Sequence, residues 1–379
     1  MHYIRSHKMK WSYFIEADNT ASIIPFEGPA IGLTTSSLSL QLSKELGDID
    51  NVEVSIASHS ALLHGEQNLS NIEFDKSINK VSLGLEGLPS KVVVLKVLIH
   101  TTSSVAVFHV ALLPSFDLPQ AVFVLGSPRS GTTVVGNMLQ RGMGIKSHGE
   151  SHMAELLATL VTTATDYVKK SPASGNKGTL TWEVESIYVK ALQVQQFREL
   201  YSSYYPGKVF IDKTPGIPML NSLPILMLAY PNAKVIYCQR RGIENIESRL
   251  RKFPQVPFEG HCRQWRQAML LWRRNKQVLS SQYFKAQNWF MDVEQFRLAK
   301  NPSEVIKSLA QFLNLDNSAY ERMLHYQATE TPQKTGSSDF SASSLESVKW
   351  SEEQKAVFKD ICNDEMQRSG YSLDNTYFV

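Results

Sequence analysis

Small, hydroxyl-bearing and cationic residues are concentrated in the segment 126–133, which reads GSPRSGTT. This segment follows an apolar, β-branched run at 122–125 and opens a helical pattern. Such a turn between a strand and a helix directs backbone N–H groups toward a phosphate. Its glycine spacing matches a Walker A loop, but Thr132 and Thr133 stand where an NTPase has Lys and then Ser or Thr. The loop, with its cation at Arg129, suits a nucleotide 5′-phosphate and lacks the lysine that reaches a β- or γ-phosphate.

A second group of phosphate-binding residue types follows the apolar run at 235–239. The run ends at Arg240, and a helix-like segment then continues to Ser248. Arginine can donate two parallel hydrogen bonds to phosphate oxygens, and a serine about two helical turns later can add a hydroxyl. Any α/β protein can have an arginine at a strand end and a serine in the next helix. Arg240 and Ser248 therefore indicate a phosphate site only in combination with the loop at 126–133.

Together, the two groups resemble sulfotransferases that use 3′-phosphoadenosine 5′-phosphosulfate (PAPS). The PRSGTT stretch at 128–133 is similar to the 5′-phosphosulfate loop of the tyrosylprotein and bacterial branches, and Arg240 with Ser248 to the pair that binds the 3′-phosphate. The resemblance covers about residues 120–375 and implies a P-loop-like fold, PAPS as co-substrate and no metal. It implies that the nucleotide is bound by Ser127, Pro128, Arg129, Ser130, Gly131, Thr132, Thr133, Arg240 and Ser248.

The resemblance also implies a general base, Glu150, which would take the proton of the acceptor hydroxyl. Tyrosylprotein-type relatives have a Gly-Glu pair at nearly this distance from the loop, and Arg129 would act beside it on the leaving phosphate. The 21 residues from Arg129 to Glu150 leave room for one helix and a return strand. His148 and His152 are alternative bases. A carboxylate that only stabilises the N-terminus of the next helix is the structural alternative for Glu150.

Two lysines complete the set of candidate site residues. Lys213 follows an apolar run in the sequence DKTP at 212–215, which looks like a motif whose lysine faces the active site in the family. A Walker B-like Mg²⁺ ligand at Asp212, or a surface Asp–Lys pair, are the alternatives. Lys334 lies in the Ser-, Thr- and Gly-rich run 331–347, where the family has a loop that closes over the nucleotide. The run departs from the family's usual Arg-Lys-Gly form, and a flexible surface loop is the alternative.

The pattern of elements changes near residue 118. Before it, short alternating runs separated by turns predict an antiparallel sandwich or small barrel, with one short helical segment at 38–46. After it, strands alternate with helices, which predicts a mostly parallel sheet covered on both faces. We therefore expect a β-rich accessory domain at 1–117 and an α/β sulfotransferase domain at 118–379. The strand runs expected before residue 118 include 52–57, 72–74, 81–85, 92–100 and 105–113.

Composition narrows the class of protein. The chain has 379 residues, 42% of them hydrophobic, and a net charge of +3, as in ordinary globular proteins. No apolar run approaches the roughly 20 residues of a membrane span. Three cysteines without metal-ligand spacing, and no signal-peptide core, predict a reduced, cytoplasmic location. Ten Lys or Arg against three Glu at 240–276 suit a polyanionic ligand, and the lack of a basic–aromatic repeat argues against nucleic acid.

The resemblance therefore implies a sulfotransferase that moves a sulfuryl group from PAPS to an acceptor hydroxyl. A P-loop kinase or NTPase is the first alternative, which Thr132 disfavours, because it occupies the position of the Walker lysine. A non-catalytic nucleotide-binding adaptor is the second. Small alcohols, carbohydrates, lipids and peptide tyrosines are all acceptors compatible with the sequence, as is any oligomeric state.

Overall fold

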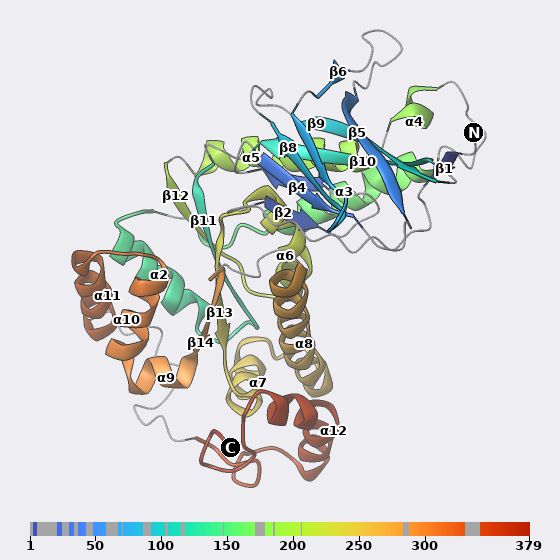
Figure 1. Cartoon of the computed structure of the whole chain (residues 1–379). Coiled ribbons are helices and arrows are strands. Elements are labelled where there is room, and N and C mark those ends of the chain that lie inside the picture. The colour runs from blue at the N-terminus through green and yellow to red at the C-terminus, as the bar shows by residue number, and fades with distance from the viewer. Residues whose placement is uncertain are drawn as a thin grey trace.

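The structure is a computed structural model of the chain. It describes residues 3–5, 21–24, 30–33, 37–42, 48–57, 67–69, 71–85, 92–102, 105–114, 118–146, 148–170, 179–184, 186–205, 207–282, 288–329 and 342–379. Figure 1 shows these residues as a β-rich N-terminal part, in blue, beside an α/β part whose helices are green to red.

A four-stranded parallel sheet forms the centre of the α/β part. Its strands lie in the order β12-β11-β13-β14, and all three neighbouring pairs are parallel. The strands are β11 (Gln120–Gly126), β12 (Val209–Lys213), β13 (Lys234–Gln239) and β14 (Phe290–Glu294). Residues 121–126 of β11 are all buried, because helices cover both faces of a parallel sheet. The predicted sheet is confirmed.

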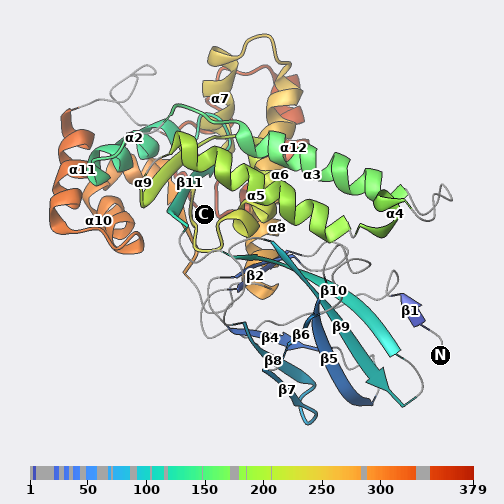
Figure 2. The same ribbon diagram turned by 90° about the horizontal axis from the view of Figure 1, so that it is seen from above.

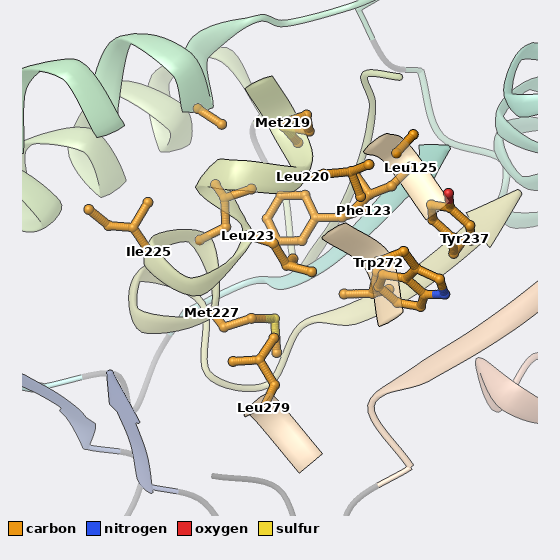
Figure 3. Packing of buried hydrophobic residues seen from close by; sticks show 14 of the residues in the cluster. Phe123, Leu125, Met219, Leu220, Leu223, Ile225, Met227, Tyr237, Trp272 and Leu279 are labelled. Carbon is orange, nitrogen blue, oxygen red and sulfur yellow. The ribbon is translucent and has the colours of Figure 1, made fainter. Parts of the chain in front are cut away.

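Helices pack on the two faces of this sheet and form two separate cores. The helices are α2 (Thr132–Met143), α3 (Met153–Lys170), α4 (Leu180–Glu183), α5 (Ser186–Tyr204), α6 (Ile217–Ala229), α7 (Gly242–Lys252), α8 (Phe258–Gln282), α9 (Gln295–Lys300), α10 (Pro302–Phe312), α11 (Asn317–Thr329) and α12 (Glu352–Arg368). Successive strand residues point to opposite faces. Phe123 and Leu125 therefore pack with α6 and α8 (Figure 3), whereas Val122 and Val124 pack with α2, α10 and α11. No described helix is both long and apolar enough to cross a membrane.

Two sheets make up the N-terminal part, as the sequence predicts. One has seven strands, in the order β2-β3-β10-β9-β5-β6 with β1 beside β10, and the other has the order β4-β8-β7. Most neighbouring strands are antiparallel, and β1 and β3 each pair with β10 in parallel. The strands are β1 (Tyr3–Arg5), β2 (Ala21–Ile24), β3 (Ala30–Leu33), β4 (Ser37–Gln41), β5 (Ile49–Ala57), β6 (Gln67–Asn68), β7 (Ile72–Asp75), β8 (Lys80–Gly84), β9 (Val93–Thr101) and β10 (Val105–Pro114).

The predicted helix at 38–46 is wrong for its first residues, because Ser37–Gln41 is strand β4. Leu38 and Leu40 are buried at alternate positions in the core between the two sheets. That period of two, together with pairing to β8, outweighs the helical propensity of a leucine-rich segment. Residues 43–47 lie outside the described part of the chain.

The seven-stranded sheet packs against the α/β part through its second face. On β9, Leu95 and Val97 point into the core between the two sheets, whereas Val94 belongs to the core that contains α5 and α6. Ala111 and Leu113 of β10 belong to the same core as Val94. In Figure 2 the strands lie below α3 and α5, which run side by side. The boundary between residues 117 and 118 stays a prediction, and a continuous apolar core crosses it.

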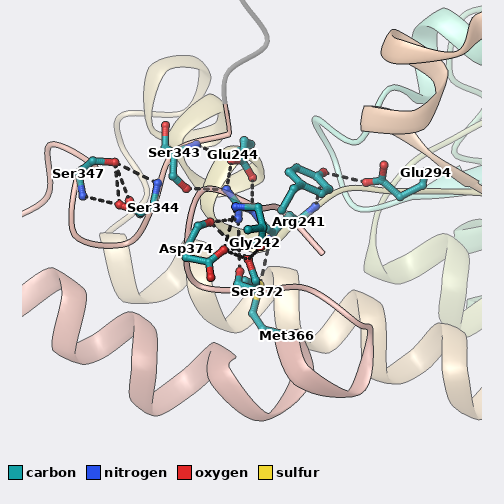
Figure 4. A network of polar contacts seen from close by, with 12 residues as sticks. Arg241, Gly242, Glu244, Glu294, Ser343, Ser344, Ser347, Met366, Ser372 and Asp374 are labelled. Atoms are coloured by element: carbon teal, nitrogen blue, oxygen red, sulfur yellow. Dashed lines mark hydrogen bonds and ion pairs between the residues drawn. The ribbon is translucent and has the colours of Figure 1, made fainter. Parts of the chain in front are cut away.

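A buried arginine attaches the C-terminal segment to the start of α7 (Figure 4). Arg241 has no exposed surface and forms an ion pair with Glu244. Its guanidinium also donates to the backbone oxygens of Ser343, at 2.5 Å, and Asp374, at 2.6 Å. A buried charge is tolerated when it is paired and hydrogen-bonded in this way. Arg241 therefore holds together segments that lie more than 100 residues apart.

We expect Arg241→Ala to lower the free energy of unfolding by about 3–5 kcal/mol, because it leaves Glu244 buried without its partner. Denaturant unfolding measures this loss. Arg263→Ala is the matched control, since Arg263 forms an exposed ion pair with Glu259 and its removal costs less than about 1 kcal/mol. Equal losses for the two variants would contradict the role of Arg241.

Candidate active site

Three predicted motifs meet at one edge of the parallel sheet. The loop after β11, residues 126–133, is hereafter the glycine loop. Lys213 ends β12 and pairs in register with Val124 of β11, and Arg240 directly follows β13. The carboxyl ends of parallel strands are where α/β proteins bind ligands. The sheet thus brings together residues that are far apart in the chain.

The backbone of the glycine loop leaves hydrogen-bond donors open. Arg129 and Gly131 both have left-handed φ angles, 75° and 91°. Gly131 is the N-cap of α2 and has no side chain to bond the N–H groups of the first turn, which carry the positive end of the helix dipole. The Ser127 hydroxyl is buried without a hydrogen-bond partner among the described residues. A Cβ at Gly126 would lie 2.4 Å from the Cys238 carbonyl oxygen, so only glycine fits there.

Helix α7 holds the glycine loop in place. The buried amide of Asn245 donates to the Pro128 carbonyl oxygen at 3.1 Å and to Ser130 Oγ at 3.0 Å. Arg129 Nε donates to Ser248 Oγ at 3.0 Å. Sequence reasoning missed Asn245. The sequence feature that could have identified Asn245 is its three-residue spacing to Ser248, which puts both side chains on one face of α7.

Arg240 contacts the backbone of the glycine loop. Its Nη1 donates to the Arg129 carbonyl oxygen at 3.2 Å, and its Nε is buried without a partner in the described structure. Burial lowers the pKa of Arg240 from its ordinary 12.5, although Tyr377 and Glu244 oppose this, and the nearby charges of Arg129 and Arg251 lower it further. Two close guanidinium groups favour an anion between them.

Glu150 and Lys213 form an ion pair beside this loop. Lys213 Nζ lies 2.9 Å from Glu150 Oε1, and the Lys213 side chain is 8% exposed against 39% for Glu150. The Lys213 alkyl chain crosses α2 at Gly136, where a Cβ would lie 2.9 Å from Lys213 Cγ. Sequence reasoning missed Gly136, although a glycine inside a helix is unfavourable and so signals a close contact.

A buried carboxylate fixes the segment that carries Glu150. Asp212 accepts hydrogen bonds from Tyr201 at 2.5 Å and from Ser151 and Thr214 at 2.7 Å each. Burial and this carboxylate raise the pKa of Tyr201 far above 10, so the phenol remains a donor. These contacts exclude the surface-pair alternative for Asp212. The described residues contain no cluster of three or more His, Cys, Asp or Glu suited to a metal.

The two histidines near Glu150 differ in their contacts. His148 Nε2 lies 3.1 Å from the Tyr204 carbonyl oxygen at the end of α5. His152 lies between two carboxylates, with Nδ1 3.0 Å from Glu155 Oε1 and Nε2 3.4 Å from Glu150 Oε2. The hydrogen bond to Glu155, with the attraction of both carboxylates, raises the pKa of His152 above 6.5. The return strand expected before Glu150 is absent from the described residues between α2 and α3.

The remaining predicted site residues differ in their exposure to solvent. Thr132 is buried and its methyl carbon packs against Gly126, whereas Thr133 is exposed at the start of α2. Lys334 lies outside the described residues, so its contact with the nucleotide stays a prediction. The roles of the other predicted site residues are likewise predictions. The fold shows only which of these residues lie close together.

We expect Glu155→Gln to return the pKa of His152 toward 6.5, because it removes the hydrogen-bonded carboxylate that raises it. NMR titration of the histidine rings measures this change, and the His148 signals serve as a control that stays in place. Since the shift is upward, the interaction stabilises the fold below pH 6.5 and is lost as the pH rises through the pKa of folded His152. An unchanged midpoint would contradict the contact.

Comparison with known proteins gives a consistent result. The sequence profile described as the sulfotransferase family matches residues 119–319. The chain is 29% identical over 222 residues to an uncharacterized protein of Aquifex aeolicus, a match that covers 57% of the chain and 28% of that protein. It is 22% identical over 200 residues to protein-tyrosine sulfotransferase 1 of Danio rerio, covering 52% of the chain and 54% of the relative.

Among solved structures, sulfotransferase STF9 from Mycobacterium avium aligns with 68% of this chain and 79% of its own, with a TM-score of 0.43 and 16% identity. The chain spans about a quarter of the length of the Aquifex relative and about half that of the Danio relative. The profile match, by contrast, extends over more than half of the 379 residues and includes β11 to β14. The protein belongs to the sulfotransferase family.

Proposed function

We propose that this protein transfers a sulfuryl group from PAPS to an acceptor hydroxyl and releases adenosine 3′,5′-bisphosphate (PAP). The observation that carries the proposal is the contact between the glycine loop and the Arg240–Ser248 pair. The two motifs to which we assign phosphate binding are therefore in contact, although Arg129 and Ser248 are 119 residues apart in the chain. A nucleotide with phosphates at both its 5′ and 3′ positions is the ligand that such a pair suits.

The residues present fit this nucleotide. The open donors are the Ser127 hydroxyl, Arg240 Nε and the uncapped N–H groups of α2, and all of them favour an anion. The position of the Walker lysine is occupied by Thr132, which packs inward. The site therefore supports a bisphosphate nucleotide better than a nucleoside triphosphate with Mg²⁺.

On the donor side, Arg129 and the N-terminus of α2 stabilise the negative charge that develops on the leaving phosphate. These groups are already fixed by Asn245 and Ser248, so they need little rearrangement during the reaction. Sulfuryl transfer, like phosphoryl transfer, depends mainly on positioning and electrostatics.

On the acceptor side, Glu150 takes the hydroxyl proton. A carboxylate is a weak base for an alcohol, so this transfer occurs late, when the acceptor oxygen is already losing charge to sulfur. Lys213, fixed by Gly136, holds the sulfuryl oxygens next to Glu150. His152 is a poorer base than its ordinary pKa suggests, because its raised pKa keeps more of it protonated near neutral pH.

We expect PAP to bind more tightly than adenosine 5′-monophosphate by about 10- to 100-fold, because hydrogen bonds to a charged group contribute about 1.5–3 kcal/mol. Isothermal titration calorimetry with both nucleotides and with ATP·Mg²⁺ measures this difference. Arg240→Ala should abolish the difference between PAP and the monophosphate. Damage to the loop alone would weaken both nucleotides equally.

Arg274→Ala is the matched control for this experiment, since Arg274 is an exposed cation of α8. It should leave the ratio of the two affinities unchanged. A preference for ATP·Mg²⁺ that is indifferent to Arg240 would instead assign the protein to the kinases or NTPases. Retention of PAP binding with no turnover of any hydroxyl acceptor would favour the adaptor.

We expect Glu150→Gln to lower kcat by about tenfold to a thousandfold, the usual range for a general base. The amide keeps a hydrogen bond to Lys213, so the Kd for PAP should stay as in the wild type. Glu155→Gln is the control carboxylate, and its kcat should change little. Near-normal turnover of Glu150→Gln, with turnover lost in His148→Ala or His152→Ala, would move the base to that histidine.

A further inference from the structure

Exposed apolar side chains are concentrated on two neighbouring helices. Eight large hydrophobic side chains are exposed in the described part of the chain, and six of them lie between residues 156 and 204. Such clusters on a protein surface commonly mark a binding site. We define the apolar face as five of the six, which are Leu156, Leu160 and Tyr167 on α3 and Leu200 and Tyr204 on α5.

The α3 members of this face form a stripe of their own. Leu156, Leu160 and Tyr167 are separated by four and seven residues, so they lie along one side of the helix. A different stripe, which includes Leu157 and Val161, packs into the core. Folding therefore requires only the second stripe, and the first is left to solvent.

The apolar face begins at the candidate base. Helix α3 starts at Met153, three residues after Glu150, and the intervening Ser151 is tied to Asp212. At a rise of 1.5 Å per residue, Leu156 and Leu160 lie about 5 and 11 Å along the helix from Met153. A molecule whose hydroxyl meets Glu150 can therefore cover both leucines if it lies along α3.

The charges at the end of the apolar face next to Glu150 are unsuited to an acidic acceptor. The segment 148–168 contains no Lys or Arg, and its charged residues include Glu150, Glu155 and Asp166. The two cations of α5, Lys190 and Arg198, are each only 3% exposed. An acidic peptide or an anionic carbohydrate on the part of the face next to Glu150 would meet carboxylates. The exposed Lys169 and Lys170 lie at the far end of α3, about 24–26 Å along the helix from Met153.

We propose that the acceptor is an uncharged amphiphile, a hydroxyl group joined to an aliphatic or aromatic body about 10 Å long that lies on the apolar face. This inference rests on the proposed function and specifies its acceptor. The acceptor oxygen bonds to sulfur as the bond from sulfur to the phosphate oxygen breaks. The hydroxyl proton passes to Glu150, and the products are a neutral body with a sulfate ester, and PAP.

A series of primary alcohols from butanol to decanol tests the proposal, with PAPS as donor and PAP release as the readout. We expect kcat/KM to rise about three- to fourfold for each added CH₂, because burial of a CH₂ contributes about 0.8 kcal/mol. The rise should stop when the chain extends beyond Leu160. An acidic tyrosine peptide, assayed beside them, should be a poorer acceptor than decanol.

Leu160→Glu should lower kcat/KM for decanol at least about tenfold, while kcat/KM for butanol and the Kd for PAP change less than about twofold. The matched control is Ile78→Glu, which replaces an exposed hydrophobic residue of the N-terminal part. It should leave all three quantities unchanged. Loss of decanol turnover in both variants would contradict a role for the apolar face.

The outcomes separate this inference from the proposed function. Failure to bind PAP overturns the proposed function before any acceptor is tested. PAP binding with sulfation of the acidic peptide, and no dependence on alcohol length, overturns the inference alone. So does a Leu160→Glu variant that changes from dimer to monomer with unchanged decanol turnover, since the face would then join two copies of the chain.

Discussion

The arrangement of the site depends on one buried amide. Asn245 of α7 donates to the carbonyl oxygen of Pro128 and to the hydroxyl of Ser130, and so fixes a loop that follows a different strand. With the loop in this position, Arg129 reaches Ser248 and Arg240 reaches the backbone of Arg129. The glycine loop and the two arginines are thereby held together, and open donors beside two cations favour an anionic ligand.

A second buried side chain, Asp212, fixes the segment that carries the proposed base, and the parallel sheet places it near the glycine loop. Asp212 collects three hydroxyl groups, one of them from Ser151, and thereby fixes the backbone next to Glu150. Because parallel strands are in register, the ends of β11, β12 and β13 lie at similar levels. Asp212 and Asn245 are therefore each only a few residues from a strand end.

Local signals predicted much of this from sequence, and long-range contacts explain the rest. The glycine loop, the strand ends at Lys213 and Arg240, and the change of pattern near residue 118 are all local features. Tyr201 and Asn245 contribute through partners elsewhere in the chain. Tyr201 therefore has no local signature, and Asn245 has only its three-residue spacing to Ser248. The strand at 38–41 was missed for the same reason, since its pairing with β8 decides its conformation. The profile match supports the family, and the contact of Lys334 stays a prediction.

Helix α5 connects regions that a domain diagram would separate. Its buried side packs against the seven-stranded sheet of the N-terminal part, where Ala111 and Leu113 lie. Its residue Tyr201 donates a hydrogen bond to Asp212. The N-terminal part is therefore not an interchangeable module, because its seven-stranded sheet supports α5, and α5 in turn supports the candidate site. Substitutions on the solvent-facing side of the three-stranded sheet leave this contact intact, whereas the seven-stranded sheet and α5 must change together to preserve their fit.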